Sequence, residues 1–310
     1  MSEIVFADPN DPILKNMVGA SVFWTLGGNV STEALTTELD LLAISKGKAE
    51  YENSPSNCTM ASALLRFMRS EYVRKDGLVR DARHPMPGSR LPSYGVFTRS
   101  ETGALNDGYV LQWSVGLTAS SPDKLASGDV GITALVFDGP CPIDRVRAGF
   151  KKALQELGHI ELSQWLTDLV KARFRAIPFG NGMFFIAPNH VNEWRELTSV
   201  LKQFGIILHE IPAMRSEQAV AAVLSSLESY SDSIREKLDE ELDKYANLPD
   251  GSRAVQKRVI AARVQQVDEQ IRLIQAYEQL FDTKMDNLRE KFTEAKAAFC
   301  KLSIVGNSYA

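Results

Sequence analysis

Cysteine and histidine are scarce in this chain of 310 residues, which holds three cysteines and four histidines. Cys58, Cys141 and Cys300 lie far apart and include no CxxC pair. A small, odd number of cysteines indicates a reducing compartment, where thiols stay free. No two histidines have the i, i+4 spacing of a helical metal site and there is no HExxH motif, so the sequence predicts no bound metal.

Motifs that carry catalysis or hold a cofactor are also missing. There is no GxSxG nucleophile elbow. The turn at Gly180-Asn181-Gly182 lacks the lysine and the following helix that would hold a phosphate. We therefore expect no cofactor, and we favour a protein that is not an enzyme.

Two kinds of targeting signal are absent. The first 16 residues carry early acidic residues and lack the basic and then apolar pattern of a signal peptide. No apolar run approaches the roughly 20 residues that a membrane helix needs. These features predict a cytoplasmic protein with no membrane contact, and the layout favours a prokaryotic or phage protein.

A long heptad pattern dominates what is present. From about Arg215 to Leu302, apolar residues recur at alternating steps of three and four, with Glu278 as one polar exception. That spacing is typical of helices packed in a coiled coil. Pro249 and the Asp250-Gly251 turn pair divide this pattern into two helical segments. Residues 213–310 are therefore predicted to form a long antiparallel helical hairpin with its turn at 247–252.

The second helix of this hairpin, about residues 253–302, is longer than the first. Its surplus end is apolar and has to be covered, either by the chain's own body or by another subunit. We therefore predict contact with a protein partner, or a homo-oligomer, through residues 213–303. The candidate interface residues are Phe281, Met285, Leu288, Phe292 and Phe299.

Residues 109–212 form the expected middle domain. GITALVF at 131–137 has the composition of a strand, and the later segments RAIPF, MFFIAP and IILHEI do so too, with helical stretches between them. The order β, α, β, β, α, β is that of a ferredoxin-like domain. Phe184 and Phe185 are adjacent, so they point to opposite faces and core packing is the simpler interpretation.

Residues 1–108 form the expected N-terminal part, with two helices followed by β structure in the order of a winged helix. Between Arg66 and Arg99, eight basic residues stand against three acidic ones, a local charge of +5 in a chain whose net charge is −4. Such residues can contact the phosphates of DNA or RNA. The candidate nucleic-acid-binding residues are Arg66, Arg69, Arg74, Lys75, Arg80, Arg83 and Arg90.

The sequence thus predicts an α+β chain, and three functions stay open. The first is a non-enzymatic nucleic-acid-associated protein that assembles or docks partners through its helical arm. The second is a protein-interaction or scaffold protein, in which the basic stretch is a solvated surface. The third is an enzyme with a site between the N-terminal and middle parts, using His84, Asp138 or His209.

Overall fold

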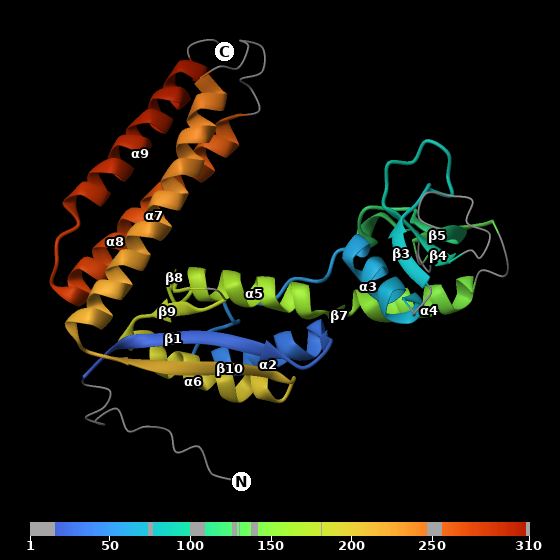
Figure 1. Cartoon of the computed structure of the whole chain (residues 1–310), viewed down its shortest axis with the longest axis horizontal. Helices are drawn as coiled ribbons and strands as arrows, with labels where there is room; N and C mark the ends of the chain where they lie inside the picture. Colours follow the sequence, from blue (N-terminus) through green and yellow to red (C-terminus); the bar gives the residue numbers. More distant parts are fainter. Residues whose placement is uncertain are drawn as a thin grey trace, which may run out of the picture. The chain divides into compact units, whose positions relative to one another are not determined.

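The computed structural model describes residues 16–73, 77–99, 109–125, 129, 131–137, 142–180, 182–246 and 256–307. They form a mixed α and β structure with antiparallel sheets (Figure 1). The helices are α2 (Thr32–Ser45), α3 (Met60–Tyr72), α4 (Ile143–Leu154), α5 (His159–Ala172), α6 (Pro188–Lys202), α7 (Glu217–Ala246), α8 (Gln256–Phe281) and α9 (Asp286–Asn307). The strands are β1 (Met17–Leu26), β2 (Val30–Ser31), β3 (Gly77–Asp81), β4 (Ser93–Arg99), β5 (Tyr109–Leu117), β6 (Ile132–Val136), β7 (Glu156–Leu157), β8 (Ile177–Pro178), β9 (Phe184–Ile186) and β10 (Ile206–Met214).

The chain divides into two compact units that alternate along the sequence. Unit 1 consists of Met1–Thr25, Asp168–Ser199 and Ile207–Ala310. Unit 2 consists of Leu26–Thr167 and Val200–Ile206. The segments expected as N-terminal and middle domains, 1–108 and 109–212, therefore each contribute residues to both units.

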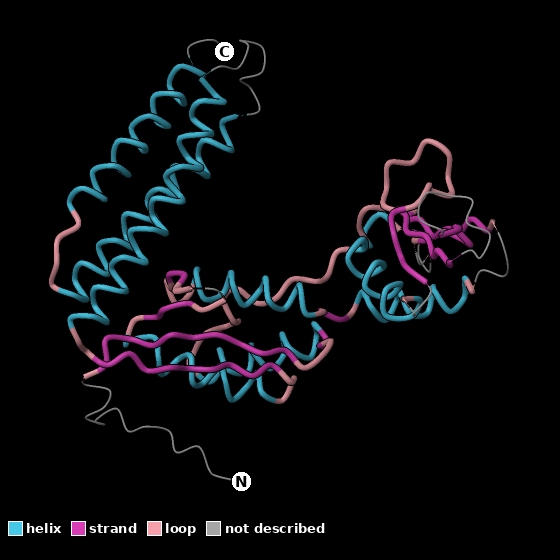
Figure 2. The backbone as a smooth tube through the Cα atoms, in the orientation of Figure 1, coloured by secondary structure: helices cyan, strands magenta, loops and turns pink. Residues whose placement is uncertain are grey.

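Unit 1 contains a four-stranded sheet in the order β10-β1-β9-β8, and the long strands β1 and β10 run side by side in Figure 2. β1 pairs antiparallel with β9, where Ser21 lies opposite Phe185. Gly19 lies in β1 with φ +151°, and a Cβ there would come within 2.3 Å of the Phe185 ring and of the Ile186 carbonyl oxygen. Only glycine permits so close an approach of strand and ring.

This pairing corrects the ferredoxin-like expectation for residues 109–212. The strand expected first, β6, is hydrogen-bonded to β5 in another sheet, and β1 instead supplies the neighbour of β9 and β10. Local pattern identified β6 and β9 as strands, but it carries no information on which distant strand each one joins.

Unit 2 contains the sheet β3-β4-β5-β6 and the short pair β2-β7. α3 packs on β3, on β4 and on α4. Thr59 caps α3 by accepting a hydrogen bond from the Ser62 N–H at 3.2 Å. Gly149 in α4 leaves space for Phe67, whose ring a Cβ would approach to 1.9 Å. The missing side chain lets α3 and α4 come close enough to cover one core.

The C-terminal arm of unit 1 is helical, as the heptad pattern predicted, but the described residues contain three helices instead of two (Figure 1). The second expected helix, 253–302, is broken between α8 and α9. α9 then turns back and packs along α8 and α7. The turn expected at 247–252 lies outside the described residues.

Glu278, the polar exception in the heptad pattern, stabilises this break. Its carboxylate accepts a hydrogen bond from the Met285 N–H at 2.6 Å, and its carbonyl accepts one from the Thr283 N–H at 3.1 Å. Asp282 has a left-handed φ of 49°, a conformation that ends a helix. The residue that interrupts the apolar stripe is therefore the one that organises the reversal of the chain.

A single hydrophobic core joins the arm to the sheet of unit 1. Tyr277 of α8 lies against Phe185 of β9, with ring centroids 6.2 Å apart. Its phenol also donates to the carbonyl oxygens of Arg175 and Phe185, both at 3.4 Å. Burial raises the pKa of Tyr277, so the phenol stays protonated and can act as this donor.

Candidate nucleic-acid interface

The structure exposes most of the basic residues that the sequence singled out. Arg74 and Lys75 lie outside the described residues. The exposed members are Arg69, Arg80, Arg83, Arg90 and Arg99. Arg66 is the exception, since it is half-buried. The stretch therefore offers solvent-facing positive charge from α3, from β3 and from the segment that follows β3.

Two of these arginines meet at one open depression of unit 2. Arg69 comes from α3 and Arg80 from β3, and both line a volume of about 550 Å³ together with Asp81 and Tyr94. Arg69 forms no ion pair with any described residue. Burial, followed by the charge of Asp81, raises the pKa of Tyr94, while Arg69 acts in the opposite direction. The depression is thus a place where two guanidinium groups from separate elements can reach one ligand.

A second depression, of about 300 Å³, adjoins the first, because Leu65 and Arg69 line both. Its other described lining residues are Asn29, Ser62, Arg66, His159, Ile160 and Glu161. Ile160 is 78% exposed, which is unusual for so large an apolar side chain. Sequence patterns did not identify Asn29, Ser62 or His159, since they come from three distant segments.

Arg66 has a structural role. Its guanidinium group forms an ion pair with Glu161 at 2.9 Å and donates to the carbonyl oxygens of Ala153 and Glu156, both at 2.6 Å. These bonds connect α3 to the end of α4 and to the start of α5. Arg66 is therefore committed to internal partners, and it is not among the exposed cations that a phosphate would meet.

Cys58 belongs to the same cluster. Its thiol donates to Glu161 at 3.3 Å, and the Arg66 guanidinium lies 3.6 Å from the sulfur atom. Burial, with the hydrogen bond to Glu161, raises the pKa of Cys58 to about 11. Burial alone would raise the pKa of Glu161 too, but its own backbone N–H, Cys58 and Arg66 together lower it. The cluster is thus a neutral thiol beside a charged pair, without a reactive thiolate.

We expect Cys58 to react slowly with thiol reagents. In the double variant Cys141→Ser/Cys300→Ser, modification at about pH 8 should be roughly 100-fold slower in the folded protein than in denaturant, since each pKa unit changes the thiolate fraction tenfold. As a control, Cys300 is exposed and should react readily when it is the only thiol left. Equal rates for Cys58 in both states would contradict the raised pKa.

The candidate interface residues of the arm lie inside unit 1. Phe281, Met285, Leu288, Phe292 and Phe299 are all at most 8% exposed, and all belong to the core of unit 1. The reason is the break after α8, which lets α9 fold back and cover the stripe. These five side chains stabilise the chain's own bundle and do not form an exposed contact surface.

The residues proposed for an enzyme have local partners. One ring nitrogen of His84 lies 2.9 Å from the Leu117 carbonyl oxygen. His209 stacks on Phe23 and bonds to Thr25 at 3.2 Å. Asp138 lies outside the described residues. Within the described part of the chain, no three histidine, cysteine or acidic side chains are grouped as a metal site would require.

None of the helices in the described part of the chain is both long enough and apolar enough to cross a bilayer.

Comparison with known protein families gives a match over the second part of the chain. A model of a family of unknown function, DUF6744, matches residues 109–305. No curated protein and no solved structure matches the chain. The matched residues include α7, α8 and α9 as far as residue 305, and they exclude the arginines between 66 and 99.

Proposed function

The chain belongs to this family of unknown function, and we propose that it is a non-enzymatic, cytosolic protein that binds nucleic acid through unit 2. The observation that carries the proposal is the meeting of Arg69 and Arg80 at one depression. Arginine is suited to phosphate because its planar guanidinium group can donate two parallel hydrogen bonds. Two such groups on separate elements can hold successive phosphates of a strand.

The surroundings of these arginines support a nucleic acid over a free anion. The adjoining depression continues the surface past Leu65 and Ile160, which offer apolar contact to unstacked bases. Asn29 and Ser62 add polar side chains at the same place. In this proposal α3 and the β3-β4 hairpin serve as a helix and wing, although α3 packs on α4 and not in a helix pair with α2.

We expect binding to depend steeply on salt, because phosphate contacts release counterions. Anisotropy of labelled single-stranded DNA, duplex DNA and RNA at about 50 and 200 mM salt measures this. The variant Arg69→Ala/Arg80→Ala should weaken binding about tenfold or more and should reduce the slope of log K against log salt by roughly 2.

The matched control is Lys151→Ala/Lys202→Ala, which removes the same charge from other exposed positions of unit 2. It should bind almost as the unmodified protein does. If both double variants weaken binding equally, the nucleic acid is attracted to positive charge in general and not to the depression at Arg69 and Arg80. No binding to any probe at low salt would reject the proposal.

A second function, a protein-interaction or scaffold role, is favoured by one observation. β10 is an outer strand of the unit 1 sheet and exposes Ile207, Ile211 and Met214, each to about half. Outer strands with exposed apolar side chains pair readily with another chain. If nucleic-acid binding fails, we propose that the arm and this strand dock a protein partner.

A further inference from the structure

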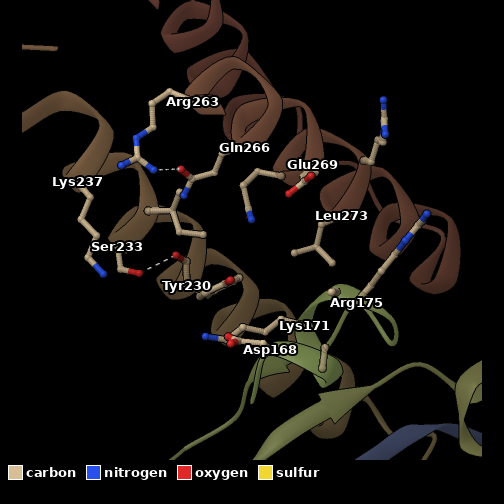
Figure 3. A pocket seen from close by; sticks show the side chains of 15 residues that line it. Asp168, Lys171, Arg175, Tyr230, Ser233, Lys237, Arg263, Gln266, Glu269 and Leu273 are labelled. Atoms are coloured by element: carbon tan, nitrogen blue, oxygen red, sulfur yellow. Dashed lines mark hydrogen bonds between the residues drawn. The ribbon is translucent and has the colours of Figure 1, made fainter. Parts of the chain in front are cut away.

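A second basic site lies in unit 1, where the end of α5 meets α7 and α8 (Figure 3). It is an open pocket of about 760 Å³. The volume falls in the range of ordinary ligand sites, roughly 300–1,000 Å³. The charged side chains that line it are Asp168, Lys171, Arg175, Lys237, Arg263, Glu269 and Arg272.

Positive charge exceeds negative charge around this pocket, with five cations against two carboxylates. Arg263 is already neutralised, because Glu241 accepts two of its hydrogen bonds at 2.6 and 2.8 Å. Lys237 and Arg272 are different: both are exposed, and neither forms an ion pair with a described residue. The pocket therefore retains cations that an anionic ligand could neutralise.

A buried polar group in the pocket also lacks a partner. Gln270 is 8% exposed, and its side-chain oxygen has no hydrogen-bond donor among the described residues. The phenol of Tyr230 lines the same pocket; burial raises its pKa, and the Gln270 side chain acts in the opposite direction. A buried acceptor without a donor is unfavourable unless something else supplies a donor. The Gln270 oxygen is itself covered, so it accepts from a ligand N–H only after the side chains around it shift.

The pocket wall beside these polar groups is apolar. Ile234 and Leu273 are both buried and both line the pocket, next to Ala172 and Ala176. In Figure 3 the Leu273 side chain points into the space between the helices, with Tyr230 on the other side. An apolar wall, an aromatic ring and an acceptor together suit a flat heterocycle that carries an amino group.

We propose that this pocket binds a nucleoside di- or triphosphate with an amino-bearing base. Lys237, Arg272 and the nearby cations take the phosphates. Tyr230, Leu273 and the Gln270 oxygen take the base. Asp168 and Glu269 would repel the backbone of a long nucleic acid, but they can accept hydrogen bonds from ribose hydroxyl groups. The site is separate from the arginine surface of unit 2, and all its residues lie within the family match, 109–305.

Calorimetric titration of the full chain with ATP, in EDTA, tests the proposal. EDTA ensures that protein cations, and no added metal ion, neutralise the phosphates. Adenosine and pyrophosphate serve as the two halves of the ligand, and ATP should bind more tightly than either. Lys237→Ala and Arg272→Ala should each weaken ATP and pyrophosphate binding about tenfold, because each removes one charged hydrogen-bond donor. The matched control is Lys284→Ala, an exposed cation of the same arm outside the pocket, which should change nothing.

Gln270→Leu separates base recognition from phosphate recognition. It keeps the volume of the side chain but removes the acceptor, so ATP and adenosine should bind more weakly while pyrophosphate is unaffected. The two exposed cation variants keep the test valid if this buried variant fails to fold. Arg69→Ala/Arg80→Ala should bind ATP normally, which distinguishes this site from the one in unit 2.

Three results would overturn the proposal. One is the absence of ATP binding at about 1 mM, which corresponds to a very weak site. Another is ATP binding that neither Lys237→Ala nor Arg272→Ala changes. The third is pyrophosphate binding as tight as ATP binding, which would show a polyanion site without a base pocket.

Discussion

Replacing Phe292 by alanine should lower the free energy of unfolding by about 3–5 kcal/mol, the usual result of removing a fully buried phenylalanine. Phe292 lies in α9, is 0% exposed and belongs to the core that joins the three arm helices to the sheet of unit 1. The variant would leave a cavity between close-packed helices, which cannot collapse without moving their backbones. The loss is large because α9 is held to α7 and α8 by side chains of this kind.

Urea or thermal unfolding followed by circular dichroism measures the effect. The matched control is Phe137→Ala, since Phe137 is 53% exposed and the same atoms are removed. That change should cost no more than about 0.5 kcal/mol. If Phe292→Ala unfolds like Phe137→Ala, then α9 does not pack on α7 and α8 as the structure shows.

The same helix shows what the sequence could predict. Spacing alone predicted that one side of this helical region is apolar, because a helix brings every third and fourth residue to one face. The residues on that side are Phe281, Met285, Leu288, Phe292 and Phe299. The partner of that face did not follow. A heptad pattern is equally consistent with one long helix and with two helices that fold back. The reversal is seen only in the structure, in the hydrogen bonds of Glu278 and the left-handed conformation of Asp282.

The pairing of strands was harder to predict from the sequence than the position of helices. β6 and β9 were recognised from their composition, yet β6 joins β5 and β9 joins β1, about 160 residues earlier in the chain. Pairing depends on long-range contacts that local periodicity does not encode. The nucleotide pocket of unit 1 was missed for the same reason, because α5, α7 and α8 contribute its lining from distant parts of the sequence.

The basic stretch illustrates the limit for single residues. Arg66 and Arg69 are three positions apart in one helix and have the same side chain. Their environments differ because Glu161 and two backbone carbonyl groups surround Arg66, whereas Arg69 faces an open depression. Counting charges along the sequence cannot separate an arginine that stabilises the fold from one that is available to a ligand.

The two arginines should therefore respond to substitution in opposite ways. Arg66→Ala should lower the free energy of unfolding by about 3–5 kcal/mol, because it leaves Glu161 as a partly buried charge without its partner. The side chains of Arg66 and Glu161 are only 17% and 21% exposed, so water screens the lost interaction weakly. Arg69→Ala removes an exposed cation and should change stability by at most about 0.5 kcal/mol.

Unfolding and nucleic-acid binding measured on both variants give four results that test this distinction. Arg66→Ala should unfold at clearly lower denaturant while its folded fraction binds oligonucleotide nearly as the parent does. Arg69→Ala should unfold at the same denaturant concentration as the parent but bind oligonucleotide more weakly. The loss of affinity should be larger at low salt, where phosphate contacts contribute most. The reverse pattern would be an Arg66→Ala variant that is as stable as the parent but no longer binds oligonucleotide. That result would identify Arg66 as a phosphate ligand and would show that the fold does not need its bonds to Glu161 and the carbonyl groups. That outcome is not expected, because a guanidinium group with three internal acceptors would have to give up those bonds before it could reach a phosphate.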